Sequence, residues 1–197
     1  MAERRKPTAM PDGRVRAVID AVRPCVDGGR FAIKRIEGDE VRVEADCFTD
    51  GHDALRVLLR WRAEGAAAWR EVEMREAGND CWRAGFAAGA PGRYLYTVVA
   101  WVDPFLTWRR ELARREDPED IAIAARVGAH LLEEAAARAG GEDRKRLAAW
   151  ARRLSDGGEP AALKALGLDE ALAEVAARHP DRSLEAAWPA PLALVVD

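Results

Sequence analysis

Tryptophan is the residue type in this sequence that offers most for binding chemistry. The chain carries seven tryptophans among its 197 residues. An exposed tryptophan can stack on the apolar face of a sugar ring, so a β-domain that displays several of them can bind carbohydrate. The candidates for such stacking are Trp69, Trp101 and Trp108. Trp61 alternates with apolar residues and Trp82 shares a strand face with an aromatic residue, so both are predicted to lie in the core.

Carboxylates are plentiful, but their spacing does not predict a catalytic pair. Two carboxyl groups that act on a sugar with retention of configuration lie about 5 Å apart. The sequence gives no sign of such a pair among Asp46, Asp50, Asp53 and Asp103. Asp103 stands directly before Pro104, and aspartate favours a turn or capping role at such a position. We therefore predict no catalytic residue in this chain.

Motifs for metals and cofactors are also missing from the sequence. The three histidines occur in neither an HxxxH nor an HExxH pattern. The three cysteines, Cys25, Cys47 and Cys81, lie far apart and form no CxxC motif. The sequence contains neither a GxSxG elbow nor a phosphate-binding loop. We expect no metal and no cofactor, and we expect the cysteines to be small core residues or bystanders.

Composition excludes several classes of partner. Lys and Arg total 31 against 34 Asp and Glu, which argues against a basic nucleic-acid-binding face. No stretch approaches the roughly 20 apolar residues that a membrane helix needs, and the N-terminal residues have no apolar signal-peptide core. The odd number of separated cysteines fits a reducing compartment. A cytoplasmic protein without nucleic-acid or membrane partners is therefore expected.

Short alternating segments predict a β-domain over residues 15–116. Apolar and polar residues alternate along 41–48 and 55–62, which is typical of strands with one buried face. Further strand signals cover 15–22, 31–34, 69–74, 82–86 and 94–102, with turn residues between them. Strands at roughly ten-residue spacing favour a β-sandwich. The first 14 residues are polar and contain proline, so we expect a disordered tail there.

The pattern changes to helical near Asp117. Asp117 is a good N-cap, Pro118 suits the first helical position, and Gly140-Gly141 can end the helix. Apolar residues then recur with helical spacing, and Ile123 and Val127 form a second stripe outside the main face. Two further helical stretches follow, the last continuing through Gly167 to the His179-Pro180 step. Short connections predict a small antiparallel helical bundle over residues 117–180.

The C-terminal residues indicate that the helices are an insertion. Residues 181–197 end in the strand-like run LALVVD. A strand that follows a helical block can return to the sandwich and complete it. The predicted fold is therefore mainly β, with a helical insert before the last strand. We also expect the chain to be the front part of a longer protein.

Three stretches together resemble one known family. They are residues 16–62 (RAVIDAVRPCVDGGRFAIKRIEGDEVRVEADCFTDGHDALRVLLRWR), 78–115 (GNDCWRAGFAAGAPGRYLYTVVAWVDPFLTWRRELARR) and 118–134 (PEDIAIAARVGAHLLEE). They are similar to the N-terminal region of bacterial α-1,4-glucan:maltose-1-phosphate maltosyltransferases of the α-amylase clan. The resemblance runs from about residue 14 to 197. Its most specific part is the aromatic-rich set Trp82, Phe86, Pro91-Gly92-Arg93-Tyr94, Trp101-Val102-Asp103, Phe105 and Trp108-Arg109.

The resemblance implies a fold and a role. It implies an immunoglobulin-like sandwich with a helical insert, which together contribute most of a homodimer interface. It also implies that catalysis lies in a (β/α)₈ barrel that follows this region. Such a barrel takes roughly 250 residues, which is more than this chain can contain. No position of this chain corresponds to the family's nucleophile or general acid. The expected role is thus dimerisation and interdomain packing in a cytoplasmic enzyme of glycogen-like glucan synthesis, with α-glucan binding as the alternative.

The run RYLYTVVAWVDPFLTWRR, residues 93–110, carries the predicted contact surface. Both faces of its strand are apolar, so one face fills the sandwich and the other must meet the helices or another domain. The predicted interface residues are Trp101, Phe105, Trp108, Arg109, Ile123 and Val127. The helical stripes leave two alternatives open, a self-contained bundle or a surface for the partner subunit. The family resemblance implies the second alternative, a surface for the partner subunit.

Overall fold

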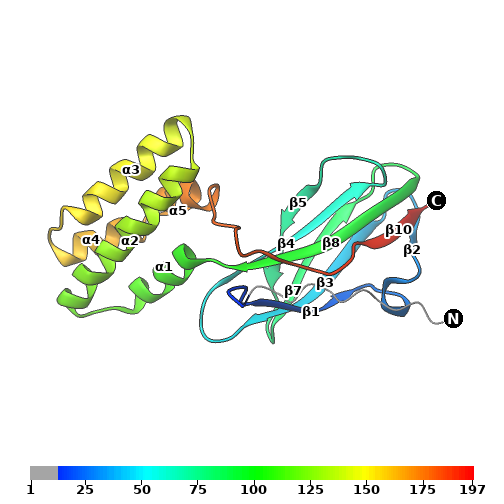
Figure 1. Ribbon diagram of the computed structural model, residues 1–197, viewed down its shortest axis with the longest axis horizontal. Helices are drawn as coiled ribbons and strands as arrows, with labels where there is room; N and C mark the ends of the chain where they lie inside the picture. Colours follow the sequence, from blue (N-terminus) through cyan, green and yellow to red (C-terminus); the bar gives the residue numbers. More distant parts are fainter. Residues whose placement is uncertain (1–12) are drawn as a thin grey trace. The chain divides into compact units, whose positions relative to one another are not determined.

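The computed structural model describes residues 13–197, which divide into two compact units (Figure 1). The first comprises 13–50, 57–101 and 184–197 and carries the sheets, so we call it the β unit. The second comprises 51–56 and 102–183 and carries the α-helices, so we call it the helical unit. The predicted disordered tail, residues 1–14, lies outside the described residues except for its last two.

The β unit contains a four-stranded and a six-stranded sheet. The first has the order β1-β3-β7-β6 with antiparallel neighbours, and the second has the order β2-β10-β8-β4-β5 with β9 paired to β8. The strands are β1 (Ala17–Arg23), β2 (Ile33–Arg35), β3 (Glu40–Thr49), β4 (Leu55–Ala63), β5 (Arg70–Glu73), β6 (Arg75–Glu76), β7 (Cys81–Ala87), β8 (Gly92–Val102), β9 (Ala186–Ala187) and β10 (Leu192–Val196), and a 3-10 helix spans Asp27–Gly29. The seven strand segments expected before residue 103 are confirmed with shifted ends, whereas the two-residue strands β6 and β9 were not predicted.

Aromatic rings join the two sheets. Phe86 of β7, in the first sheet, stacks on Trp61 of β4 with 4.9 Å between ring centroids. Its centroid is 6.3 Å from that of Tyr96 in β8, which belongs to the second sheet. Trp82 is buried as predicted, and its Nε1–H donates to the Cys47 carbonyl at 3.1 Å. The alternation read along β3 is confirmed, because its inward side chains from Val41 to Cys47 are buried.

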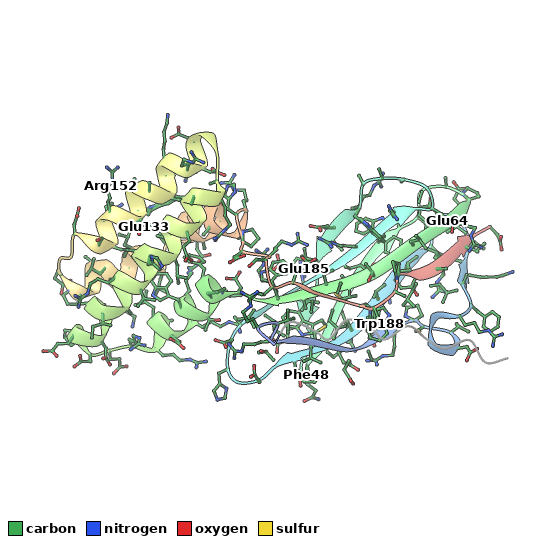
Figure 2. The ribbon with its side chains drawn as sticks, viewed as in Figure 1. Phe48, Glu64, Glu133, Arg152, Glu185 and Trp188 are labelled. Carbon is green, nitrogen blue, oxygen red and sulfur yellow. The ribbon has the colours of Figure 1, made fainter. Side chains whose placement is uncertain are left out.

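The last strand completes the β unit, as the sequence predicted. β10 pairs antiparallel with β8 and parallel with β2, so it lies inside the sheet. The segment that leads to it is fixed by the ion pair of Glu185 (Figure 2) with Arg60 at 3.1 Å. The Trp188 N–H donates to the Val98 carbonyl at 2.9 Å. The helices are therefore inserted before the final strands of the β unit.

The helical unit is built from five α-helices in its described residues. They are α1 (Pro104–Arg114), α2 (Pro118–Arg138), α3 (Gly141–Ser155), α4 (Pro160–Gly167) and α5 (Glu170–Ala177). Asp117 caps α2 as predicted, because its Oδ1 accepts from the N–H groups of Glu119 and Asp120 at 2.9 and 3.0 Å. The two-residue connection through Gly140 makes α2 and α3 neighbours that run in opposite directions.

Two helix predictions need correction. The sequence placed residues 104–114 in the β-domain, whereas they form α1, with Asp103 as the N-cap accepting from the Leu106 N–H at 3.0 Å. The capping role predicted for Asp103 is thus confirmed, although the helix that it caps was missed. The last helical stretch was read as continuous past Gly167, whereas it breaks into α4 and α5. The break is fixed by Asp169, whose side chain accepts from the Leu172 N–H at 3.0 Å.

An ion pair ties α3 to the residues after α5. The His179 ring Nε2 lies 2.9 Å from Asp143 Oδ2, and Arg178 lies 3.4 Å from the other carboxylate oxygen. The hydrogen bond from His179, followed by the charge of Arg178, lowers the pKa of Asp143 below its ordinary 3.8. A carboxyl whose pKa is lower in the folded state stabilises the fold above the unfolded pKa and loses that contribution as pH falls through the folded pKa.

We therefore expect Asp143→Asn to lower the thermal midpoint at neutral pH and to flatten the fall of stability in acid. The flattening should occupy the window below pH 3.8, where the wild-type carboxylate becomes protonated. Thermal unfolding by circular dichroism, repeated between roughly pH 2 and 7, measures this. The control is Glu142→Gln, whose side chain is 73% exposed. Identical pH profiles for wild type and Asp143→Asn would contradict the assignment.

Candidate functional site

Trp108 is the central side chain of the helical core. It is 5% exposed, and its Nε1–H donates to the Ala124 carbonyl of α2 at 2.8 Å. Two glycines form its slot. A Cβ at Gly128 would lie 2.1 Å from Trp108 Cζ2, and one at Gly167 would lie 2.9 Å from Trp108 Cη2. The core of the helical unit therefore closes around this indole and requires glycine beside it.

Phe105 and Arg109, two other predicted interface residues, also belong to this core region. The Phe105 ring centroid lies 5.5 Å from that of Trp108, and Phe105 is partly buried against the helical core. The Arg109 Nη2 donates to the Leu168 carbonyl at 2.7 Å and to Glu170 Oε1 at 2.9 Å. Arg109 therefore fastens α1 to the junction between α4 and α5. Trp108, Phe105 and Arg109 therefore all make contacts within the helical unit.

Ile123 and Val127 are placed differently, because they remain exposed. Their exposed fractions are 53% and 50%, and they stand four residues apart on the outer face of α2. Residues at this spacing lie one above the other on a helix. The other predicted face of α2 is confirmed as buried, including Ile121, Ala125 and Leu132. The second stripe read from the sequence is therefore an apolar surface of the helical unit.

Trp101 belongs to the core of the β unit. It is 2% exposed and clusters with Leu58 and Val99. Trp101 and Trp108 are both buried, so neither presents an exposed ring face in this structure, whereas glucan stacking by the three tryptophans stays a prediction. Trp69 is half-buried, and the Arg62 guanidinium carbon lies 4.6 Å from its ring centroid. The six predicted interface residues thus fall into three groups. Trp101 lies in the core of the β unit, Phe105, Trp108 and Arg109 pack within the helical unit, and Ile123 and Val127 are exposed.

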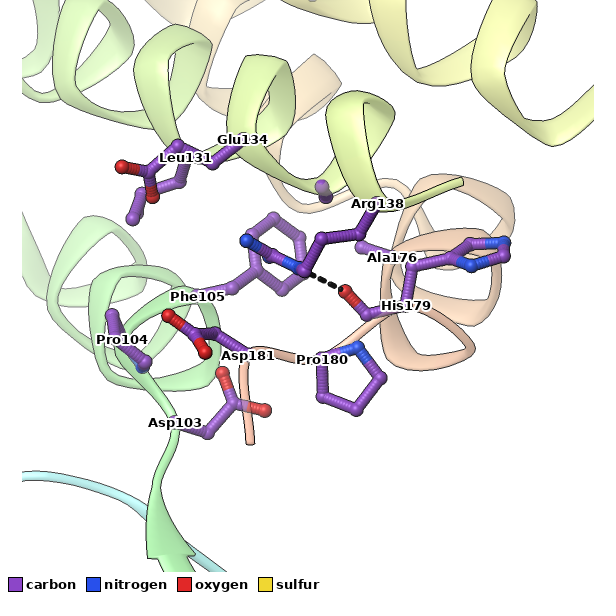
Figure 3. A pocket seen from close by; sticks show the side chains of 11 residues that line it. Asp103, Pro104, Phe105, Leu131, Glu134, Arg138, Ala176, His179, Pro180 and Asp181 are labelled. Carbon is purple, nitrogen blue, oxygen red and sulfur yellow. Dashed lines mark hydrogen bonds between the residues drawn. The ribbon is translucent and has the colours of Figure 1, made fainter. Parts of the chain in front are cut away.

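A small cavity lies within the helical unit, between the start of α1, the end of α2 and the residues after α5. Its volume is about 40 Å³, which suits a water-sized group and not a sugar. Figure 3 shows Asp103, Asp181 and Arg138 among its lining side chains, with the Arg138 Nε–H donating to the His179 carbonyl at 3.1 Å. Asp181 accepts from the Ser183 N–H, and this backbone hydrogen bond lowers its pKa. The two aspartates therefore have local structural partners.

The chain offers no assembled metal site in residues 13–197. No group of three or more His, Cys, Asp and Glu side chains there is arranged to hold a metal ion. None of the helices in the described part of the chain combines the length and the apolar character needed to cross a membrane.

A larger cleft opens at one end of the β unit, and the sequence did not predict it. Its volume is about 360 Å³, and it lies between the segment that joins β4 to β5 and the segment that joins β7 to β8. Two aromatic side chains, Trp61 and Tyr94, and two arginines, Arg62 and Arg70, line it together with alanine and glycine residues. Trp61 was predicted as core, and it does stack on Phe86 while it also borders this cleft.

Comparison with known proteins assigns the chain to a family. The sequence model of the family described as alpha-1,4-glucan:maltose-1-phosphate maltosyltransferase, domain N/S, matches residues 15–197. The chain belongs to this family. The resemblance read from the sequence is therefore confirmed. The matched residues include the strands of both sheets, the five helices and the returning strand, so the helical insertion is part of domain N/S.

Several maltosyltransferases are similar to the chain over most of its length. The alpha-1,4-glucan:maltose-1-phosphate maltosyltransferase of Chlorobaculum tepidum is 46% identical over 187 residues, which are 94% of this chain and 28% of the relative. That of Myxococcus xanthus is 43% identical over 175 residues, 84% of this chain and 26% of the relative. The Salinibacter ruber protein is 39% identical over 174 residues. The chain thus spans just over a quarter of the length of each of these three relatives.

Proposed function

We propose that the chain is the non-catalytic N-terminal part of an enzyme that transfers maltosyl units from maltose-1-phosphate to α-1,4-glucans. Its coverage of 28% of the Chlorobaculum tepidum relative leaves the larger part of such an enzyme outside it. The aspartates at the small cavity of the helical unit are engaged in capping and turn hydrogen bonds, which fits a structural domain. Release of phosphate from maltose-1-phosphate by the purified chain with a glucan acceptor would contradict the non-catalytic role.

Within that enzyme we propose that the helical unit contributes to a homodimer contact and that the β unit, an immunoglobulin-like sandwich, packs against the catalytic barrel. The observation that carries the dimer contact is the exposed pair Ile123 and Val127. The main apolar face of α2 is buried within the unit, whereas these two residues are half exposed to solvent at adjacent turns. An apolar pair on an otherwise polar helix face favours a contact with another protein surface. A cytoplasmic location agrees with three free cysteines.

The dimer contact is tested by charging that pair. We expect the chain of residues 1–197 to self-associate, and the double substitution Ile123→Glu and Val127→Glu to weaken association by roughly 100-fold, because buried carboxylates without partners are costly. Sedimentation velocity over a range of concentrations measures the dissociation constant. Both side chains are exposed, so the circular dichroism spectrum should not change.

The matched control places the same charges elsewhere at the same spacing. Ala161→Glu and Ala165→Glu stand four residues apart on α4, and both alanines are exposed. This control should associate like the wild type. If the Ile123/Val127 variant associates as tightly as the wild type and the control, the proposed contact is wrong.

A further inference from the structure

The cleft at the end of the β unit has the dimensions of a ligand site. Its volume of about 360 Å³ falls in the range typical of pockets that hold small molecules. Apart from the two aromatics and two arginines, its lining consists of alanine and glycine residues, all of which are exposed. Such small side chains cannot fold over the aromatic rings. The composition of the lining therefore keeps Trp61 and Tyr94 accessible from the cleft.

Both aromatic side chains are held in place by neighbours in the same unit. Trp61 stacks on the buried Phe86 at 4.9 Å with 20° between the ring planes. The Tyr94 hydroxyl donates to the Ala90 carbonyl at 2.9 Å, which ties the ring to the segment between β7 and β8. A ligand that contacts these rings would therefore lose little side-chain freedom of the protein on binding, which favours affinity.

The two arginines of the cleft differ in their partners within the protein. Arg62 is committed to the protein, because its Nη1 donates to the Ala66 carbonyl at 2.7 Å and its guanidinium lies over Trp69. The Arg70 side chain is exposed and makes no hydrogen bond or ion pair with the residues that the structure describes. Glu64 (Figure 2), in the segment after β4, is paired with Arg93 at 2.8 Å. The described lining of the cleft therefore presents one available guanidinium and no carboxylate.

We propose that this cleft binds a segment of an α-1,4-linked glucan. Sugar rings would stack their apolar faces on Trp61 and Tyr94, and hydroxyl oxygens would accept hydrogen bonds from Arg70. A phosphorylated sugar fits less well, because tight phosphate binding uses converging guanidinium or backbone N–H donors, and only one guanidinium is available here. The choice of glucan as the carbohydrate rests on the proposed function, whereas the location and the aromatic chemistry rest on the cleft itself.

The test is a titration of the chain of residues 1–197 with maltoheptaose, followed by tryptophan fluorescence and by calorimetry. We expect saturable binding with a dissociation constant on the order of 1 mM. The substitution Ala68→Glu fills the cleft from an exposed position and should weaken binding by roughly tenfold or more. The control Ala77→Glu introduces the same side chain at an exposed alanine outside the lining and should bind like the wild type.

Three results would overturn the proposal. They are the absence of saturable binding by the wild type, equal binding by Ala68→Glu and the wild type, and binding of maltose-1-phosphate or inorganic phosphate without binding of maltoheptaose. Equal affinity for a β-1,4-linked oligosaccharide would overturn the glucan assignment. Sedimentation of Ala68→Glu separates this site from the dimer contact, because self-association should be unchanged. If the wild-type chain binds maltoheptaose but does not self-associate, only the proposed dimer contact is overturned.

Discussion

Replacing Gly128 with alanine should destabilise the helical unit by about 2–3 kcal/mol, which is typical of overpacking a well-filled core. Alanine normally favours a helix interior over glycine by up to about 1 kcal/mol. Here the added Cβ would stand 2.1 Å from Trp108 Cζ2 and 2.5 Å from Cε2. The indole cannot simply retreat, because its Nε1–H is bonded to Ala124 and Gly167 lies close to its ring. Urea unfolding followed by circular dichroism measures the loss.

A matched control and a double mutant isolate the cause. Gly89→Ala adds a Cβ where no atom lies within 4 Å and the backbone is not left-handed, so its effect should stay within about 0.5 kcal/mol. In a double-mutant cycle with Trp108→Leu, the cost of Gly128→Ala should shrink by more than about 1 kcal/mol, because the clashing ring is gone. A stabilising Gly128→Ala substitution would show that helix preference, and not the Trp108 slot, governs this position.

The strand pattern was readable wherever one face of a segment is buried. The alternation along β3 follows from burial of every second side chain. In β4 the predicted apolar face is buried at Leu55, Val57 and Leu59, but Leu58 on the other face is buried as well. The strands β6 and β9 have two residues each, which is too short to show an alternation of apolar and polar residues. Helix starts were readable from capping chemistry, as at Asp117. The same capping chemistry occurs at Asp103-Pro104, but β8 ends at Val102, directly before the cap, so the strand pattern and the start of α1 adjoin without a loop between them.

The candidate sites depend on contacts that sequence spacing does not contain. Trp101 and Trp108 stand seven residues apart, yet one joins the β-unit core and the other the helical core, because the chain changes from β8 to α1 between them. The slot for Trp108 depends on Gly167, which α4 brings in from 59 residues away. The cleft at the end of the β unit exists because small alanine and glycine side chains from two separate connecting segments leave space beside Trp61 and Tyr94. Only the exposed pair Ile123 and Val127 was visible in advance, as a second helical stripe.

Replacing Leu194 with alanine should destabilise the β unit by about 2–5 kcal/mol, the usual cost of truncating a fully buried leucine. Leu194 is 0% exposed, and it lies between Tyr94 of β8 and Ile33 of β2 in the sheet register. Its removal would leave a cavity at the centre of a strand that pairs on both sides. Because β10 follows the whole helical insertion, a large effect would mean that the β unit cannot reach full stability until the chain has returned. Urea unfolding followed by tryptophan fluorescence measures the change.

The neighbouring position supplies the contrast. Val195 is only partly buried and faces the opposite side of the same strand, so Val195→Ala should cost less than about 1 kcal/mol. The two substitutions disturb the same backbone pairing and differ in the face from which methyl groups are lost. A large difference between them would locate the stabilising contribution of β10 in the buried face between the sheets. Equal costs would mean that β10 contributes through its backbone pairing alone, and that the residues before the helices form a core that does not need Leu194.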